Sequence, residues 1–518
     1  MTTQGPPAPG LCVEPGFPAF AEAFGQGRPQ VVWTRVIDDL ETPVSAYLKI
    51  GASAPYSFLF ESVEGGAWRG RYSIITLKPD LVWRAFGGKA EIARGGAVGR
   101  GVFTPEPKGA LDSLRALVEA SAIALPDSLP PMAAGLFGTL GYDMIRLFEP
   151  VGPDKPDVLG LPDAVMARPS VVAVFDAIAQ EIVLITPVRP EGEAAEAAYA
   201  AACERLKAVR ADLSKPLPTM TDGHPAEAPA LQSKTTRADY HRIVERAKRY
   251  IEAGDIFQVV PSHRFSAPLP GDPFALYRSL RRTNPSPFLY YLNFDGFQLV
   301  GSSPEILVRL RDGKVTIRPI AGTRPRGATV EEDQRLEREL LADQKEIAEH
   351  LMLLDLGRND VGRAVMLRDE GANAPVTTRP RVRVTEKFKV ERYSHVMHIV
   401  SNVEGDAPEG LDPVDVILTA LPAGTLSGAP KVRAMQIIDE LETEKRGLVY
   451  AGAAGYISAN GAVDTCIVLR TALVKDGVMY VQAGGGVVAD SDPDAEYDET
   501  IHKSNALRRA AAEAWRFR

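Results

Sequence analysis

The chain has 518 residues, of which 45% are hydrophobic and 24% are charged, the balance of an ordinary globular protein. Its net charge of −8 argues against a nucleic-acid partner, because phosphate recognition needs a clustered excess of Lys and Arg. No apolar run approaches the roughly 18 residues of a membrane span, so we expect no membrane partner. Residues 1–16 lack the basic start and apolar core of a secretory signal, and we expect a short disordered leader there.

Cysteine usage indicates the compartment. Cys12, Cys203 and Cys466 lie far apart and lack the spacing of a metal site. An odd, sparse set is typical of a reducing environment rather than of a disulfide framework. We therefore expect a cytoplasmic protein.

In chain order, the first half mixes strands, loops and a helix. Residues 171–188 predict two buried strands around a short turn, and residues 194–212 predict a helix. A stretch rich in Pro, Ala and Thr at 214–236 predicts a linker or a long surface loop. It divides the chain into an N-terminal region, 17–213, and a C-terminal region, 237–518.

The second half opens with a helix near 239–253, whose apolar residues share one face and whose N-cap is Thr236. The segment IFQVV (256–260) predicts a strand in which Gln258 points away from the face of its apolar neighbours. Residues 331–360 form the longest helical pattern of the chain. Strands and helices follow one another without a regular βαβ rhythm, which predicts an α+β fold.

Two Glu-x-x-Glu pairs lie on predicted helices. Glu346 and Glu349 are neighbours on one face of the 331–360 helix, and Glu496 and Glu499 are neighbours on a helix near the C-terminus. A single pair of this kind is usually a solvated helix face. If the two helices face each other, the four carboxylates suit a hard cation such as Mg²⁺, which prefers a few carboxylate oxygens and retains waters.

Two further features have both an ordinary and a functional interpretation. Gly484, Gly485 and Gly486 follow a predicted strand, and they form either a plain turn or a place where backbone N–H groups approach an anion. Arg470 ends an apolar strand, either as an edge residue or as a clamp for a carboxylate. Neither the glycines nor GTLSGAPK (424–431) has the spacing of a nucleotide-binding loop.

Seven segments together carry a more specific signal: PIAGTRPRG (319–327), KEIAEHLMLLDLGRND (345–360), YSHVMHIVS (393–401), GTLSGAPKVRAM (424–435), YAGAAGYIS (450–458), DTCIVLR (464–470) and QAGGGVVADSDPDAEYDET (482–500). In this order they resemble the chorismate-utilising enzymes, and within them the large, chorismate-binding subunits (component I) of anthranilate synthases. The resemblance is dense from 236 to 509 and looser in the N-terminal half. It implies the family's fold, a large β-sandwich core of two packed antiparallel sheets with helices outside.

The resemblance also implies a Mg²⁺-dependent site for chorismate. Glu349 and Glu499 would bind the metal directly, and Glu346 and Glu496 would act through its water. Arg470 would bind the pyruvyl carboxylate of the substrate. The other substrate-binding residues implied are Gly322, Thr323, Tyr450, Gly484, Gly485, Gly486 and Lys503.

Three side chains are implied in the chemistry itself. Glu305 matches the general acid toward the leaving ring hydroxyl, a role that requires a protonated carboxyl group, and an ordinary solvated Glu is the alternative. His398 aligns with the His of the second half-reaction, in which the aminated intermediate loses pyruvate and the ring becomes aromatic. Thr425 lies in a segment that lines the same site.

Two positions favour one product within the family. Members that add water to chorismate carry a Lys base where this chain has Gln258, a residue that suits an amine nucleophile. Many aminodeoxychorismate synthases carry a nucleophilic Lys in the loop that here reads PIAGT, with Ala321. We therefore expect direct attack by ammonia and formation of anthranilate, the first committed step of tryptophan biosynthesis. Aminodeoxychorismate synthase is the alternative, and a catalytically silent tryptophan sensor is an alternative of a different class.

Regulation and a partner are also implied. SFLFES (57–62) and NPSPFL (284–289) resemble the feedback segments of anthranilate synthases, with Ser62, Pro287, Phe288 and Leu289 as the tryptophan-binding residues. No part of the chain resembles a glutaminase, so ammonia is expected to come from a separate glutamine amidotransferase subunit (component II). We expect a heterotetramer of two large and two small subunits.

Overall fold

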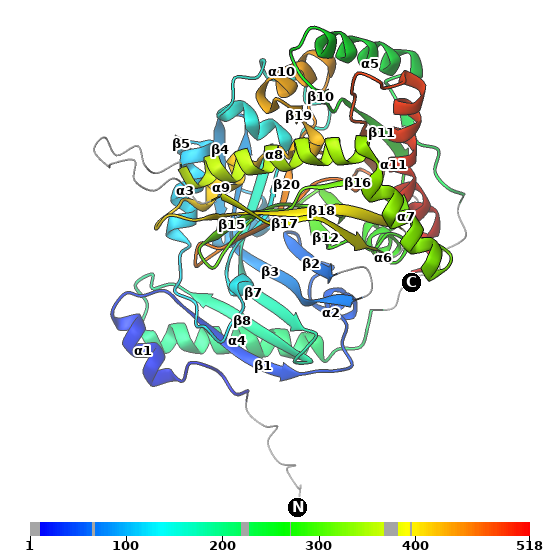
Figure 1. Ribbon diagram of the computed structural model, residues 1–518. Helices are drawn as coiled ribbons and strands as arrows, with labels where there is room; N and C mark the ends of the chain where they lie inside the picture. The colour runs from blue at the N-terminus through cyan, green and yellow to red at the C-terminus, as the bar shows by residue number, and fades with distance from the viewer. Residues whose placement is uncertain are drawn as a thin grey trace, which may run out of the picture.

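The computed structural model describes residues 11–64, 68–218, 227–269, 271–366, 382–393 and 396–517. Most of the expected leader (1–10) and part of the expected linker (219–226) lie outside the described residues. Helices and antiparallel strands are mixed along the chain (Figure 1), which confirms the α+β prediction. None of the described helices is both long enough and apolar enough to cross a bilayer.

Hydrogen bonding joins 21 strands into one continuous antiparallel sheet, and two long strands bend it into two layers. These are β3 (Trp68–Phe86) and β7 (Ala164–Asp176), which pair with each other along most of their length. The beginning of β3 pairs with β2 (Ser57–Glu64) and its end pairs with β4 (Lys89–Arg94). The expected two sheets are therefore joined through β3 and β7.

The first layer runs, neighbour by neighbour, through β9 (Gln232–Ser233), β11 (Ser262–Pro268), β23 (Val478–Gly484), β22 (Thr471–Lys475), β13 (Phe297–Ser303), β12 (Phe288–Asn293), β2, β3, β7, β8 (Glu181–Val188) and β1 (Gln30–Ile37). The second runs through β5 (Thr104–Gly109), β4, β3, β7, β6 (Gly135–Leu140), β20 (Ala453–Ser458), β21 (Val463–Ile467), β14 (Ile306–Arg311), β15 (Lys314–Ile317) and β18 (Val396–Asp406), and β18 also pairs with β16 (Ile320–Pro325) and β17 (Val382–Arg392). A separate pair consists of β10 (Gln258–Val259) and β19 (Gly428–Ala429).

The buried side chains show that the two layers pack face to face. One cluster combines Trp33 and Tyr290 of the first layer with Phe137 and Tyr456 of the second, and among the described residues it includes none from an α-helix. Neighbouring residues of a strand point to opposite faces, so Leu289 packs on the outer side of β12 while Tyr290 packs inside. The interior of the molecule is thus a sandwich core between the two layers.

Helices cover the outer faces of this sandwich. One group packs outside the first layer: α1 (Phe17–Gly25), α2 (Pro43–Ile50), α4 (Ala195–Leu213), α6 (Pro273–Thr283) and α11 (Pro493–Glu513). Another packs against the second layer and its loops: α3 (Ala110–Ala120), α5 (Arg237–Glu252), α8 (Gln344–Met366), α9 (Pro413–Ala420) and α10 (Lys431–Leu441). A shorter helix, α7 (Val330–Ala342), precedes α8 and packs on β16 and β18 (Figure 1).

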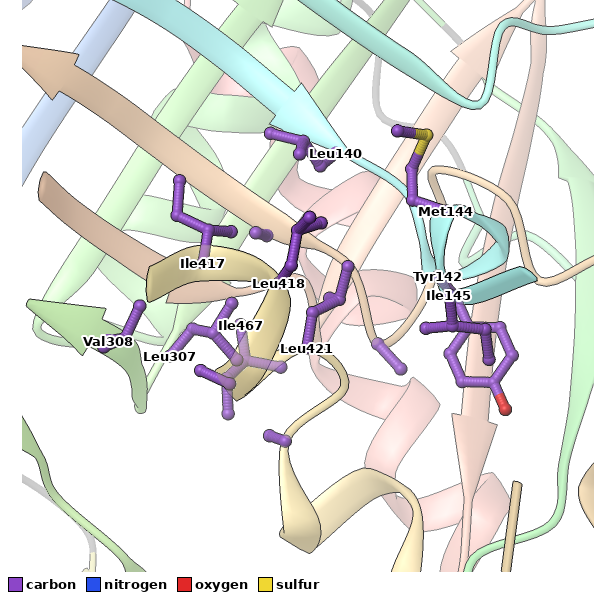
Figure 2. Packing of buried hydrophobic residues seen from close by; sticks show 14 of the residues in the cluster. Leu140, Tyr142, Met144, Ile145, Leu307, Val308, Ile417, Leu418, Leu421 and Ile467 are labelled. Atoms are coloured by element: carbon purple, nitrogen blue, oxygen red, sulfur yellow. The ribbon is translucent and has the colours of Figure 1, made fainter. Parts of the chain in front are cut away.

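Both sides of the expected linker contribute strands to the same layers. β2 pairs with β12 in the first layer, and β6 pairs with β20 in the second. Figure 2 shows the same mixing among side chains, where Leu140 and Met144 pack in one cluster with Ile417, Leu418 and Ile467. The two regions of the sequence therefore share one core.

The long helix expected at 331–360 is divided into α7 and α8. Asp343 adopts an extended conformation between them, and its carboxylate accepts hydrogen bonds from the backbone N–H groups of Lys345 (3.0 Å) and Glu346 (3.3 Å). Asp343 thus caps the N-terminus of α8, which the apolar pattern alone does not reveal. The helix expected at 239–253 is α5, and Thr236 caps it as predicted.

Candidate active site

The two Glu-x-x-Glu pairs approach each other from different helices. Glu346 and Glu349 lie on α8, and Glu496 and Glu499 lie on α11. Burial is the main cause that raises the pKa of Glu349. The nearby negative charge of Glu346 adds to this effect, and so does that of Glu499 on the other helix. Burial also raises the pKa of Glu496, again with a contribution from Glu499. Carboxylates that disfavour each other's charge across two helices form an acidic centre.

Protein cations already bind two of these four carboxylates. Lys503 lies 2.6 Å from Glu499 and also donates a hydrogen bond to the carbonyl of Gly484 at 2.9 Å. Arg324 forms an ion pair with Glu346 at 2.9 Å. Among the residues that the structure describes, no group of three or more His, Cys, Asp or Glu side chains is gathered as a metal cluster.

The acidic centre nevertheless has the chemistry that a hard cation requires. Oε2 of Glu496 is buried and has no hydrogen-bond partner, although Ser491 binds its other oxygen at 2.7 Å. An unpartnered buried carboxylate oxygen is costly unless something compensates for its charge. Oxygen donors of this kind are the ligands that Mg²⁺ prefers, so the residues fit this ion.

The glycines at the end of β23 lie against this centre. A Cβ atom at Gly485 would be 2.5 Å from Oε2 of Glu496, and one at Gly486 would be 2.6 Å from Nε2 of Gln258. That amide nitrogen is 3.4 Å from Glu349, while Oε1 of Gln258 is buried without a partner. The absence of side chains therefore lets the backbone at the end of β23 and just after it lie close to Glu496 and Gln258.

A second group of site residues surrounds Glu305, between β13 and β14. Burial raises the pKa of Glu305 to about 8, against opposing effects of the Thr425 hydroxyl and the charge of Arg470. The hydroxyl lies 3.2 Å and 3.1 Å from the two carboxylate oxygens. Glu305 is therefore largely protonated near neutral pH and can donate a proton, and it is not an ordinary solvated Glu.

Arg470 is a partly buried cation whose charge acts on both Glu305 and His398. It lies between β21 and β22 and adopts a left-handed backbone conformation, with φ of 48°. Burial lowers the pKa of Arg470, and the negative form of Glu305 counteracts this. This placement favours the clamp interpretation over that of an edge residue. A guanidinium beside a neutral carboxyl group is suited to bind an incoming carboxylate.

His398 on β18 faces the loop of β16. Its Nδ1 is 3.2 Å from the carbonyl oxygen of Gly322 and 3.0 Å from the hydroxyl of Thr323. A carbonyl oxygen only accepts, so the ring proton is on Nδ1 and Nε2 is the basic atom. Burial lowers the pKa of His398, with a further contribution from the charge of Arg470. His398 is therefore a neutral base at neutral pH.

The two groups meet at Gly322, where an added Cβ atom would be 3.2 Å from Oε2 of Glu346. A Cβ atom at Gly484 would be 3.1 Å from the Tyr450 hydroxyl, and burial raises the pKa of Tyr450. Two residues that contact the acidic centre were missed: Arg324, which binds Glu346, and Ser491, which binds Glu496. Ser491 precedes Asp492, the N-cap of α11, and no sequence motif singled it out.

The residues expected to bind tryptophan lie elsewhere, on β2 and β12. Ser62 and Leu289 line a cavity of about 420 Å³ together with Ser73 and Arg281. Phe288 lies on the other face of β12 and packs against the sandwich core, because successive strand residues alternate. Pro287 precedes the strand, and neither Pro287 nor Phe288 lines the cavity.

Known proteins with similar sequences match this chain over almost its whole length. Residues 99–509 match the family described as chorismate binding enzyme. Anthranilate synthase component 1 of Cereibacter sphaeroides is 55% identical over 503 residues, which cover 97% of this chain and 98% of that protein. The corresponding protein of Pseudomonas aeruginosa is 48% identical over 481 residues, covering 92% and 94%.

Solved structures give the same result. Anthranilate synthase component I from Streptococcus pneumoniae superimposes with a TM-score of 0.73 at 36% identity, over 92% of this chain and 99% of that one. The isochorismate synthase MenF of Escherichia coli has a TM-score of 0.67 at 19% identity, over 95% and 99%, and so shares the fold. The chain belongs to the chorismate-binding enzyme family.

Proposed function

We propose that this chain is component I of an anthranilate synthase, which aminates chorismate with ammonia and then eliminates pyruvate to give anthranilate. The observation that carries this proposal is the 55% identity with a protein of that name over 97% of the chain. The site supports this proposal at two positions. Gln258 lies beside Glu349. Ala321 directly precedes Gly322 and Thr323, the two residues that contact His398. Neither Gln nor Ala can act as a base or covalent nucleophile.

In this proposal Glu349 and Glu499 hold Mg²⁺, and Glu346 and Glu496 act through its water. When bound there, the ion stabilises negative charge on the ring carboxylate and on the departing hydroxyl. Lys503, which lies 2.6 Å from Glu499, would compete with the ion for this carboxylate. The glycines at 484–486 let the substrate carboxylate approach the backbone beside this centre.

The chain's own groups supply the proton transfers. Glu305, with its raised pKa, donates a proton to the leaving ring hydroxyl as ammonia attacks, and Thr425 orients its carboxyl group. Arg470 binds the pyruvyl carboxylate. In the second step Nε2 of His398 removes the ring proton, so that pyruvate leaves and the ring becomes aromatic. Thr323 and the Gly322 carbonyl keep His398 in the tautomer that this step requires.

Ammonia comes, in this proposal, from a glutamine amidotransferase component II, in a cytoplasmic heterotetramer of two large and two small subunits. The relatives are named anthranilate synthase component 1, which supports the existence of a second component. Tryptophan inhibits by binding the cavity that Ser62 and Leu289 line. Several acidic residues line this cavity together with Arg281, which pairs with one of them, Glu61, at 2.6 Å. Groups of both charges are thus present for the ammonium and the carboxylate of an amino acid.

One experiment tests the activity directly. The purified chain is mixed with chorismate, Mg²⁺ and an ammonium salt, and anthranilate is followed by its fluorescence. We expect anthranilate to form without any second protein. Accumulation of a non-aromatic amino compound would instead identify an aminodeoxychorismate synthase. Tryptophan binding without any turnover would indicate a sensor.

A further inference from the structure

A buried ion pair between Glu442 and Arg446 lies next to the proposed site. The proposed mechanism assigns no role to either residue. Arg446 is 1% exposed and Glu442 is 9% exposed. The guanidinium donates to both carboxylate oxygens, from Nε at 2.9 Å and from Nη2 at 2.6 Å. A two-point contact of this kind fixes the plane and the direction of the guanidinium.

The other donors of Arg446 bind the backbone on either side of two site residues. Nη2 donates to the carbonyl of Val260 at 2.7 Å, two residues after Gln258. Nη1 donates to the carbonyl of Leu426 at 3.0 Å, next to Thr425. Arg446 therefore links the two segments that carry Gln258 and Thr425, in addition to their direct backbone pairing as β10 and β19.

The same guanidinium packs on the rings of two tyrosines. Its centre lies 5.3 Å from the ring centroid of Tyr450 and 4.6 Å from that of Tyr142. A cation at this distance from an aromatic face is attracted to it, and the attraction is stronger where water is excluded. Arg446 thus also sets the position of Tyr450, the substrate contact at the edge of the site.

Glu442 extends the contact to the glycine strand. Its Oε1 accepts hydrogen bonds from the backbone N–H of Ser262 at 2.8 Å and from the hydroxyl of Ser262 at 2.9 Å. Ser262 stands directly opposite Gly484 in the β11–β23 register, and it accepts a hydrogen bond from Gln482 at 2.8 Å. The carboxylate therefore holds the end of β23 in place through its neighbour strand.

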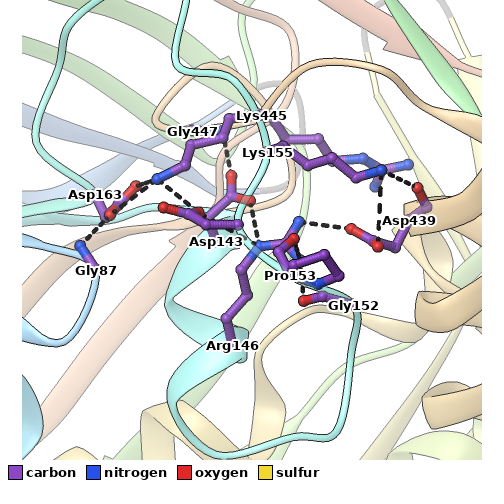
Figure 3. Close-up of polar contacts among 12 residues, drawn as sticks. Gly87, Asp143, Arg146, Gly152, Pro153, Lys155, Asp163, Asp439, Lys445 and Gly447 are labelled. Atoms are coloured by element: carbon purple, nitrogen blue, oxygen red, sulfur yellow. Dashed lines mark hydrogen bonds and ion pairs between the residues drawn. The ribbon is translucent and has the colours of Figure 1, made fainter.

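The backbone around Arg446 is itself held from the N-terminal region. Figure 3 shows Asp143 receiving a hydrogen bond of 2.8 Å from the N–H of Gly447, and Lys445 reaching Asp163 at 3.2 Å. Arg146 joins the same network by contacting Asp143. Both the backbone next to Arg446 and its guanidinium group are therefore held in place, so the segments that the guanidinium contacts are held as well.

We propose that Glu442 and Arg446 form a positioning pair for the chorismate site, which sets the relative placement of Gln258, Thr425 and Tyr450. A buried ion pair is a poor way to gain net stability, because apolar residues of similar volume are often equally or more stabilising. A planar guanidinium offers several donors in fixed directions, which an apolar residue cannot. The pair therefore contributes by fixing the positions of the site segments rather than by stabilising the fold. This inference rests on the proposed function.

Three variants separate positioning from stability, with ammonium as the nitrogen source. Arg446→Met leaves Glu442 buried and unpaired, so its Tm should fall. The double variant Glu442→Met/Arg446→Met removes that charge, and its Tm should return toward that of the unmodified protein. We expect its kcat to stay lower on the order of 10²-fold, because misplacement by about 1 Å is enough for such a loss. Arg446→Lys keeps the charge but cannot bind Glu442, Val260 and Leu426 together, and we expect a near-normal Tm with a reduced kcat.

The control is another two-point Arg–carboxylate contact, between the buried Arg168 and the half-exposed Asp80, whose two hydrogen bonds are 2.8 Å and 3.0 Å. Arg168→Met/Asp80→Asn should change Tm and leave kcat and KM for chorismate unaltered. Recovery of both Tm and kcat in the Glu442/Arg446 double variant would overturn the proposal. If that variant does not fold, full activity of Arg446→Lys overturns it. Absence of anthranilate from the unmodified protein contradicts the proposed function instead, which keeps the two failures distinct.

Discussion

The hydroxyl of Thr425 lies within hydrogen-bond distance of both carboxylate oxygens of Glu305, at 3.2 Å and 3.1 Å. A hydroxyl donor stabilises the charged form of a carboxylate, whereas burial stabilises the neutral form. Burial prevails here, and the pKa of Glu305 is about 8. The contact therefore adjusts the pH at which Glu305 loses its proton.

The first prediction concerns the pH profile. As a general acid Glu305 acts while protonated, so kcat should fall as the pH rises through about 8. Glu305→Gln should lower kcat by about 10²- to 10⁴-fold and remove this alkaline limb. Thr425→Val, which loses the hydroxyl donor, should shift the limb to higher pH. An unchanged alkaline limb in Glu305→Gln would exclude Glu305 as its origin.

Stability gives a second readout of the same group. The folded pKa of about 8 lies above the ordinary 4.5, so the folded state binds the proton more tightly than the unfolded state. The contribution to the free energy of unfolding is complete below the unfolded pKa and declines as the pH rises through the folded one. Urea unfolding at pH values on both sides of this window should show the decline, and Glu305→Gln should lack it.

The second prediction concerns the metal. Glu349→Gln and Glu499→Gln should each weaken Mg²⁺ binding at least about 10-fold, and chorismate binding with it, because the ion and the substrate stabilise each other. Calorimetry measures the affinity for Mg²⁺ without turnover. Asp312→Asn, a change in the turn between β14 and β15, serves as the control. Unaltered Mg²⁺ affinity in both Glu variants would refute the metal assignment.

The third prediction separates the two half-reactions. His398→Ala should slow pyruvate loss by about 10²- to 10⁴-fold while amination continues, since the base acts only in the second step. The aminated, non-aromatic intermediate should then accumulate, which chromatography with mass detection can follow over time. If amination and pyruvate loss slow equally, His398 does not act in the second step alone.

The fourth prediction tests the glycine strand. In Gly485→Ala the new Cβ would lie 2.5 Å from Oε2 of Glu496, so the carboxylate must move. Because a flexible side-chain end can move at small cost, the fold should persist and Tm should change little. KM for chorismate and the requirement for Mg²⁺ should both rise. Gly99→Ala, at a position with no atom within 4 Å of the added Cβ and no left-handed φ, is the comparison for the added methyl group alone.

The fifth prediction concerns inhibition. Ser62→Ala should weaken tryptophan inhibition roughly 2- to 10-fold, the effect expected for loss of one hydrogen bond. The ammonia-dependent kcat without tryptophan should be unchanged. The measurement is the tryptophan inhibition constant of Ser62→Ala compared with that of Ser170→Ala, since Ser170 lies outside the cavity. Equal constants would remove Ser62 from the binding site.

Local sequence patterns predicted much of the candidate site. Glu349, Glu499 and the glycines after β23 were found from spacing, and the resemblance related them to one another. Two strong local signals, helical periodicity and the Thr236 cap, also located α5 correctly. These features depend on residues close together in the chain, which is why sequence reasoning can find them.

Other features depend on contacts that no local pattern contains. The break at Asp343 divides an apolar stripe that looks continuous, and the pairing of β2 with β12 joins segments more than 200 residues apart in sequence. Glu442 and Arg446 stand in the charged run ELETEKRG, whose spacing is typical of a solvated helix end. Only the packing of β11 and the 424–428 segment around them shows that they are buried.

The strand pairs that join the two regions of the sequence have a consequence for how this polypeptide can be divided. A single backbone cut within 214–236 would leave the pairs β2–β12 and β6–β20 intact, so the two fragments should stay together as one enzyme. Either fragment produced alone would expose unpaired strand edges and would aggregate. The protein can therefore tolerate being encoded as two pieces, but neither piece can evolve or be transplanted as an independent module.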